Sequence, residues 1–159
     1  MKIVKTSEVA WADNLNKGAF QQRRKELGST GKMSAGLWEL APGKKSFPFH
    51  MHHVTEEALY VVSGSARVRT ADGMTPISAG DCGMFPPGPS GGAHQLINDG
   101  PEPMVYLALG VSMGVDIVEY PDSGKIVATD GKGGGRPPGP NSIRHVSRVK
   151  DAVDYWEGE

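Results

Sequence analysis

The sequence lacks the features that mark several large classes of protein. Cys82 is the single cysteine, so no intrachain disulfide can form, which fits a reducing compartment. The formal net charge of −1 gives no general attraction to nucleic acid or acidic membranes. No apolar run approaches the roughly 18 residues of a membrane-spanning helix, and residues 1–5 lack the apolar core of a signal peptide. We therefore expect a cytoplasmic protein with no nucleic-acid or membrane partner.

Glycine and proline are abundant, with 22 and 12 residues, about a fifth of the 159-residue chain. The hydrophobic fraction of 38% still allows a packed core, and the length is typical of a single domain. We therefore expect one domain over residues 1–159, built from short elements joined by turns. Residues 131–140 are almost pure glycine and proline and predict a loop, which leaves residues 141–159 as a C-terminal tail.

Strand-like segments recur about every 8–12 residues from position 35 onwards, which is typical of an antiparallel sandwich or barrel. The expected strands are residues 35–40, 47–52, 57–62, 65–70, 74–77, 82–85, 94–98, 104–111, 115–120 and 125–129. Residues 20–27 fit a short helix or an irregular strand equally well. In the tail, an apolar stripe of Val149, Val153 and Trp156 predicts a short helix from Ser147 to Trp156, packed on the barrel or on a partner.

The most informative stretch contains two histidines in an alternating segment. Residues i and i+2 of a strand share a face, so His50 and His52 would project side by side and could bind one metal ion. Glu57 opens the next strand and could add an oxygen, with Glu56 as its rival on spacing alone. His94 could supply a third imidazole from a later strand. Such a set suits a divalent Zn, Mn, Fe, Ni or Co ion.

Each of these residues also has a simpler interpretation. An isolated His-x-His in a strand is more often structural or exposed than a metal site, and a lone His94 would most often be a core or turn residue. His53 points away from His52, so we expect it at the surface or in an interface, and His145 lies between basic residues in the tail, so we expect it at the surface. Cys82 sits in an apolar segment and is expected to be a small buried side chain.

The combination resembles the two motifs of the cupin family, over about residues 34–110. The first motif is matched by Gly43, His50, His52, Glu57 and Gly64, and the second by Gly80, Pro86, Gly88, His94 and Asn98, with a longer gap before His94 than the family has. The resemblance implies an all-β fold, the double-stranded β-helix or jelly-roll barrel. It also implies a metal ion held inside by His50, His52, Glu57 and His94, and it selects Glu57, with a catalytic role, over Glu56.

The cupin fold hosts many activities, so three functions stay open. Some cupins are sugar-phosphate isomerases, and we favour a metal acting as a Lewis acid on a sugar phosphate or related polyol. The surface cations that could anchor such a phosphate are Lys44, Lys45, Arg67 and Arg69. The second function is a metal-dependent dioxygenase for a small aromatic or thiol substrate, with an apolar pocket formed by Phe85, Leu96, Met104 or Tyr106. The third is a non-catalytic module that binds a small ligand.

The alternating segment also predicts an oligomer. If His50 and His52 face the interior, then Phe47, Phe49 and Met51 face outward, and such an apolar face needs cover. The N-terminal segment, the C-terminal tail or a second subunit could supply it. Because cupins are commonly dimers, we expect a homodimer.

Overall fold

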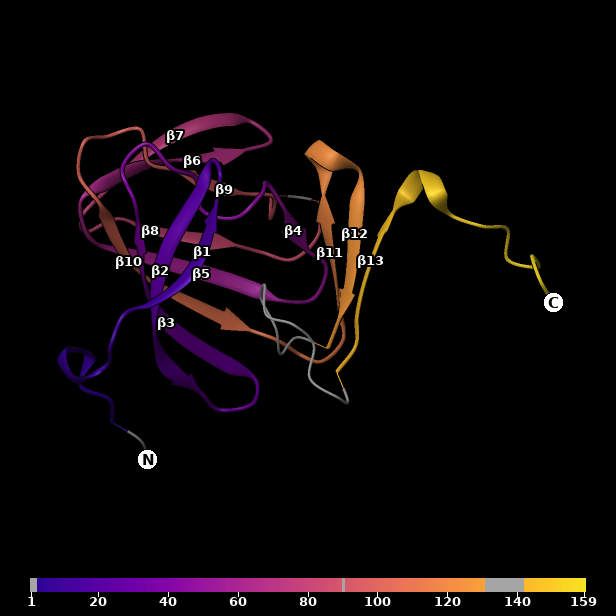
Figure 1. Cartoon of the computed structure of the whole chain (residues 1–159), viewed down its shortest axis with the longest axis horizontal. Coiled ribbons are helices and arrows are strands. Elements are labelled where there is room, and N and C mark those ends of the chain that lie inside the picture. Colours follow the sequence, from indigo (N-terminus) through magenta and orange to yellow (C-terminus); the bar gives the residue numbers. More distant parts are fainter. Residues whose placement is uncertain (1–2, 90, 131–141) are drawn as a thin grey trace.

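The chain is built from three antiparallel sheets (Figure 1). A computed structural model describes residues 3–89, 91–130 and 142–159. The largest sheet has the strand order β1-β2-β3-β10-β5-β8, the second has the order β13-β12-β11-β4, and the third has the order β7-β6-β9. Within these described residues the helical elements are three short 3-10 turns, and no helix is long and apolar enough to cross a membrane. The predicted all-β jelly-roll class is confirmed.

The strands alternate with turns, as the distribution of glycine and proline predicted. Their bounds are β1 (Ala12–Lys17), β2 (Phe20–Ser29), β3 (Met33–Leu40), β4 (Met51–His52), β5 (Glu56–Ser63), β6 (Ser65–Thr70), β7 (Gly73–Ser78), β8 (Cys82–Phe85), β9 (Gln95–Ile97), β10 (Met104–Val111), β11 (Asp116–Tyr120), β12 (Lys125–Thr129) and β13 (Arg144–Arg148). The 3-10 turns are η1 (Thr6–Glu8), η2 (Pro121–Ser123) and η3 (Val149–Asp151). The undecided segment 20–27 is therefore strand.

The main core lies between the inner faces of the sheets. Leu40, Val61 and Met104 are completely enclosed, and burial of each such side chain stabilises the fold by roughly 1.5–3 kcal/mol. Leu40 pairs with Met104 near one end of the large sheet, whereas Glu57 pairs with Gly110 near the other. Apolar packing therefore fills one end of the barrel and leaves Glu57 at the opposite end.

One glycine and one asparagine of the sequence motifs, Gly64 and Asn98, have structural roles. Gly64 makes the tight turn between β5 and β6 with φ +77°, and a side chain there would collide with the carbonyl oxygen of Pro103. Asn98 is completely buried, and its amide donates to the carbonyl oxygens of Leu40 and Glu102. These residues hold turns at the Leu40–Met104 end of the barrel, opposite to Glu57.

The predicted strand 47–52 is wrong over most of its length, because only Met51–His52 forms a strand. Pro48 cannot donate a ladder hydrogen bond, and the preceding segment is instead held by single contacts such as Gln95 Nε2 to the Phe47 carbonyl oxygen, 2.7 Å. The outward apolar face predicted there is also wrong. Phe49 and Met51 are buried and cluster with Ala93, while Phe47 packs against the main core. The chain covers these side chains itself, so they do not require a second subunit.

The predicted helix from Ser147 to Trp156 is wrong as well. Residues 144–148 form the edge strand β13, in which Ser147 pairs with Ile126, and η3 is the only helical turn after it in the described chain. Val153 and Trp156 are 69% and 72% exposed, so the apolar stripe has no surface in this chain to stabilise a short helix. The tail extends away from the barrel (Figure 1). The predicted 131–140 loop lies outside the described residues.

Candidate metal centre

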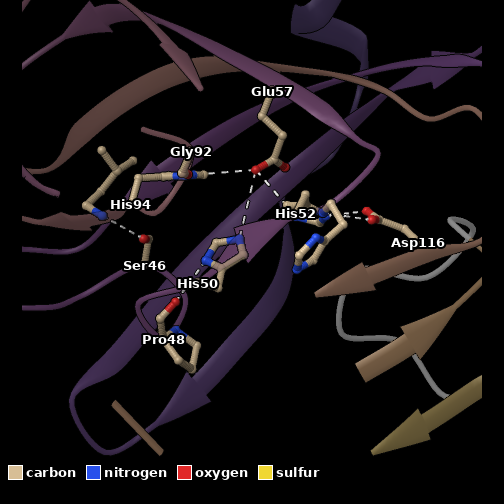
Figure 2. A network of polar contacts seen from close by, with 10 residues as sticks. Ser46, Pro48, His50, His52, Glu57, Gly92, His94 and Asp116 are labelled. Atoms are coloured by element: carbon tan, nitrogen blue, oxygen red, sulfur yellow. Dashed lines mark hydrogen bonds and ion pairs between the residues drawn. The ribbon is translucent and has the colours of Figure 1, made fainter. Parts of the chain in front are cut away.

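The structure brings together the four predicted ligands from three separate segments. His50 lies just before β4 and His52 lies within it. Glu57 lies in β5, and His94 directly precedes β9. The Nε2 atoms of His50, His52 and His94 lie 3.9, 3.6 and 3.4 Å from Oε2 of Glu57. Figure 2 shows these side chains converging on the Glu57 carboxylate. One small volume is therefore faced by three imidazole nitrogens and one carboxylate oxygen.

Each of the three histidines has its second ring nitrogen, Nδ1, held by an acceptor. Nδ1 of His50 lies 2.9 Å from the carbonyl oxygen of Pro48, and Nδ1 of His94 lies 2.8 Å from that of Gly92. Nδ1 of His52 lies 2.6 Å from Oδ2 of Asp116. Because these acceptors require the proton on Nδ1, each Nε2 presents a lone pair to the centre. This pattern of outer hydrogen bonds is typical of metal-binding histidines.

The donor set fits a divalent metal ion. The ligand atoms of His50, His52 and Glu57 all lie within 4.8 Å of one another. Ligands at about 2.0–2.2 Å from a tetrahedral ion are separated by roughly 3.4 Å, close to the spacing between each imidazole and the carboxylate. Neutral imidazole with one carboxylate suits Zn, Mn, Fe, Ni or Co.

Burial keeps two of the imidazoles neutral. Loss of solvent, with a smaller contribution from His52, lowers the pKa of His50 to about 4. Loss of solvent and the proximity of His50 lower the pKa of His94 to about 4. Both rings are therefore unprotonated at neutral pH, the state in which histidine binds metal.

Asp116 is the site residue that the sequence interpretation missed. Its side chain is 1% exposed, and Oδ1 accepts the backbone N–H groups of His53 and Val54 at 3.1 and 2.9 Å. Burial raises the pKa of Asp116, but hydrogen bonds from His52 and Thr55 outweigh burial and lower the pKa overall. The ionised carboxylate therefore fixes the ring of His52. The alternation of side chains along the strand could have identified Asp116, because it shares a strand face with the buried Val118.

The glycine-rich turn before β9 positions His94. Gly88 N–H donates to the carbonyl oxygen of His52 at 2.7 Å, and Gly92 accepts from the His94 ring. His94 and His50 exchange backbone hydrogen bonds of 2.9 and 3.3 Å. The His94 ring stacks on Phe85, with ring centroids 3.8 Å apart. The longer gap of the second motif therefore still delivers His94 to the other ligands.

Other residues considered from the sequence lie outside the cluster. His53 pairs with Glu119 at 2.6 Å, and His145 and Glu56 are exposed. Cys82 is exposed rather than buried, because its side chain is on the outer face of β8. Three of the four predicted phosphate anchors are occupied elsewhere: Lys44 donates to the Gly18 carbonyl oxygen, and Arg67 and Arg69 pair with Asp99 and Asp122.

The fold and the site together define a class of protein. Its members are small antiparallel barrels with three histidines and one glutamate at one end. Residues 36–110 match the cupin domain family, and this part of the chain is a cupin domain. None of the curated proteins matches the chain.

Solved structures extend the similarity beyond the matched domain. A protein from Acidithiobacillus ferrooxidans with a provisional assignment as a sugar phosphate isomerase is 29% identical, with a TM-score of 0.71 over 86% of this chain and 81% of its own. A cupin-superfamily sugar phosphate isomerase from Silicibacter pomeroyi is 21% identical, with a TM-score of 0.76 over 95% of both chains. A polyketide cyclase from Streptomyces resistomycificus is 19% identical, with a TM-score of 0.59 over 70% of this chain and 79% of its own. The matched residues therefore form a cupin domain, and the chain as a whole resembles structures described as sugar phosphate isomerases.

Proposed function

We propose that this cupin binds one divalent metal ion through His50, His52, Glu57 and His94 and isomerises a sugar phosphate or related polyol. The convergence of three Nε2 atoms on Glu57, each ring fixed through Nδ1, is the observation that carries the metal site. A bound metal ion would supply Lewis acidity toward a substrate carbonyl or hydroxyl. The 29% identity with the Acidithiobacillus protein supports the choice of substrate class.

The residues of the chain provide the remaining requirements of such a reaction. Glu57 is 32% exposed, so its carboxylate can meet a substrate while its neighbours His50 and His94 stay buried. Tyr120 stacks on His50 with ring centroids 5.9 Å apart, which places a phenol next to the cluster. Burial raises the pKa of this phenol, so it stays protonated and can donate to a substrate oxygen.

The side chains expected to line an apolar dioxygenase pocket are used in packing. Leu96 and Met104 belong to the main core, and Phe85 is stacked on His94. The hydroxyl of Tyr106 donates to Oε1 of Gln22 at 3.0 Å. An oxygenase reaction on a small aromatic or thiol is therefore the alternative outcome of the test below, and a ligand-binding module without catalysis is the third.

The test is a substrate screen with metal-reconstituted protein. Aldose and ketose phosphates are incubated with the protein and followed by NMR, with the unphosphorylated sugars and a Glu57→Gln variant as controls. We expect aldose–ketose interconversion of a phosphorylated sugar that Glu57→Gln strongly reduces. Oxygen uptake with a small aromatic or thiol, or binding of a sugar phosphate with no turnover of any member of the panel, would overturn the isomerase proposal.

A further inference from the structure

The sheet face that carries His52 also carries a group of basic side chains. His52 on β4 pairs with Val118, which pairs with Val127 on β12. Residues that pair across the strands form a row, and side chains alternate along each strand. The rows two residues before and after His52–Val118–Val127 therefore share its sheet face. Those rows are Tyr120–Lys125–Arg148 and Asp116–Thr129–Arg144. Figure 1 shows β4, β11, β12 and β13 side by side. Three cations therefore share the face of this sheet that holds a predicted metal ligand.

Tyr120 connects these cations to the metal residues. Its ring lies nearly parallel to that of His50, at 21°. Nζ of Lys125 lies 5.5 Å from the centroid of the Tyr120 ring. With ring centroids 5.9 Å apart, the Lys125 ammonium is at most 11.4 Å from the centroid of the His50 ring. Arg144 acts electrostatically on the same phenol. Lys125 therefore lies beside Tyr120 next to the cluster, and the strand register places Arg144 on the same sheet face, four residues along β13 from the residue that pairs with Lys125.

Neither cation is neutralised within the described residues. Arg23, Arg67 and Arg69 pair with carboxylates, whereas no carboxylate of the described chain forms an ion pair with Lys125 or Arg144. Two like charges on one face repel each other unless an anion lies between them. A phosphate monoester carries up to two negative charges and several acceptor oxygens, which match an ammonium and a guanidinium.

We propose that Lys125 and Arg144 bind the phosphate of a small phosphorylated polyol whose oxygens face His50, His52, His94 and Glu57, with Tyr120 between the two ends. This inference rests on the proposed function and deepens it by assigning the anion-binding residues. It replaces the four surface cations expected from the sequence. Because the anion site and the metal ligands lie on different residues, phosphate binding can be tested without turnover.

The test measures inorganic phosphate binding to the chelator-treated full-length protein at low ionic strength, by phosphorus NMR titration. Removing metal ensures that phosphate cannot bind through a metal ion. The test variant is Lys125→Met with Arg144→Gln, and each single substitution is also measured. The matched control is Lys44→Met with Arg67→Gln, which removes two cations of the same types away from the site. Circular dichroism verifies that each variant is folded.

We expect saturable binding that weakens about tenfold or more in the test variant, by a smaller factor in each single variant, and hardly at all in the control. Absence of saturable binding to the wild-type protein would overturn the anion site. Equal weakening in the test and control variants would do the same, because it would show a general charge effect. If phosphate binds as expected but no sugar phosphate is isomerised, the proposed reaction fails while the anion site stands.

Discussion

Replacement of Asp116 by Asn tests whether the buried carboxylate prepares His52 for metal binding. Oδ2 of Asp116 lies 2.6 Å from Nδ1 of His52, while Oδ1 accepts the backbone N–H groups of His53 and Val54. An asparagine oxygen can keep the two backbone contacts. Its amide nitrogen would then face Nδ1 of His52 and favour the proton on Nε2. The substitution therefore removes the lone pair from the metal-facing nitrogen without removing a ligand.

The expected effect is a 10–100-fold loss of metal affinity, about 1.4–2.7 kcal/mol, as is usual when the outer partner of a metal-binding histidine is lost. Glu119→Gln is a close control. Glu119 lies on the same strand, β11, and contacts His53 at 2.6 Å, but His53 lies outside the cluster. This variant should retain wild-type affinity.

The assay is a zinc titration in competition with a chromophoric chelator, with all variants at the same protein concentration and pH. Thermal unfolding of the metal-free proteins verifies that Asp116→Asn is folded. Wild-type zinc affinity in Asp116→Asn would refute the role of the carboxylate. Equal losses in Asp116→Asn and Glu119→Gln would refute it as well, because they would report general surface charge.

Three further predictions concern the ligands, acid stability and assembly. His52→Ala should lose most bound metal, whereas Glu57→Gln should lose less because three imidazoles remain; elemental analysis showing full occupancy in His52→Ala would contradict the ligand assignment. The metal-free protein should lose stability as the pH falls from about 6.5 to about 4, because the unfolded chain then binds protons that buried His50 and His94 exclude. The loss should be up to about 1.4 kcal/mol per pH unit for each histidine, and an unfolding midpoint in urea that is equal at pH 7 and pH 5 would contradict it. We propose that a second copy of the chain covers the outer face of the large sheet, where Tyr60, Val62 and Met84 are 47%, 50% and 72% exposed. Light scattering should give a dimer mass for the wild-type protein and a monomer mass for Met84→Glu. A monomer mass for the wild-type protein at micromolar concentration would contradict this proposal.

The ligand cluster could be predicted because its signal is local in the sequence. His50 and His52 share a face through two-residue spacing, and motif order added Glu57 and His94. Spacing alone could not separate Glu57 from Glu56. The structure separates them, since Glu57 contacts all three histidines whereas Glu56 is exposed. Adjacent strand residues point to opposite faces, so only one of the two can enter the site.

The remaining features depend on contacts between distant segments. Asp116 lies 64 residues from His52 in the sequence, and no local spacing connects them. Lys125 and Arg144 come together only through the pairing of β11, β12 and β13. The helix prediction for the tail was wrong for the same reason, because residues 144–148 pair with β12 as a strand. Local apolar spacing is a weak guide where backbone pairing with another segment is available.

The most direct measurement is anomalous X-ray diffraction from crystals equilibrated with manganese. We expect one strong peak within bonding distance of the Nε2 atoms of His50, His52 and His94 and of the Glu57 carboxylate. No peak at this position in crystals that diffract well, or a peak bound by other residues, would show that these four side chains do not form a metal centre.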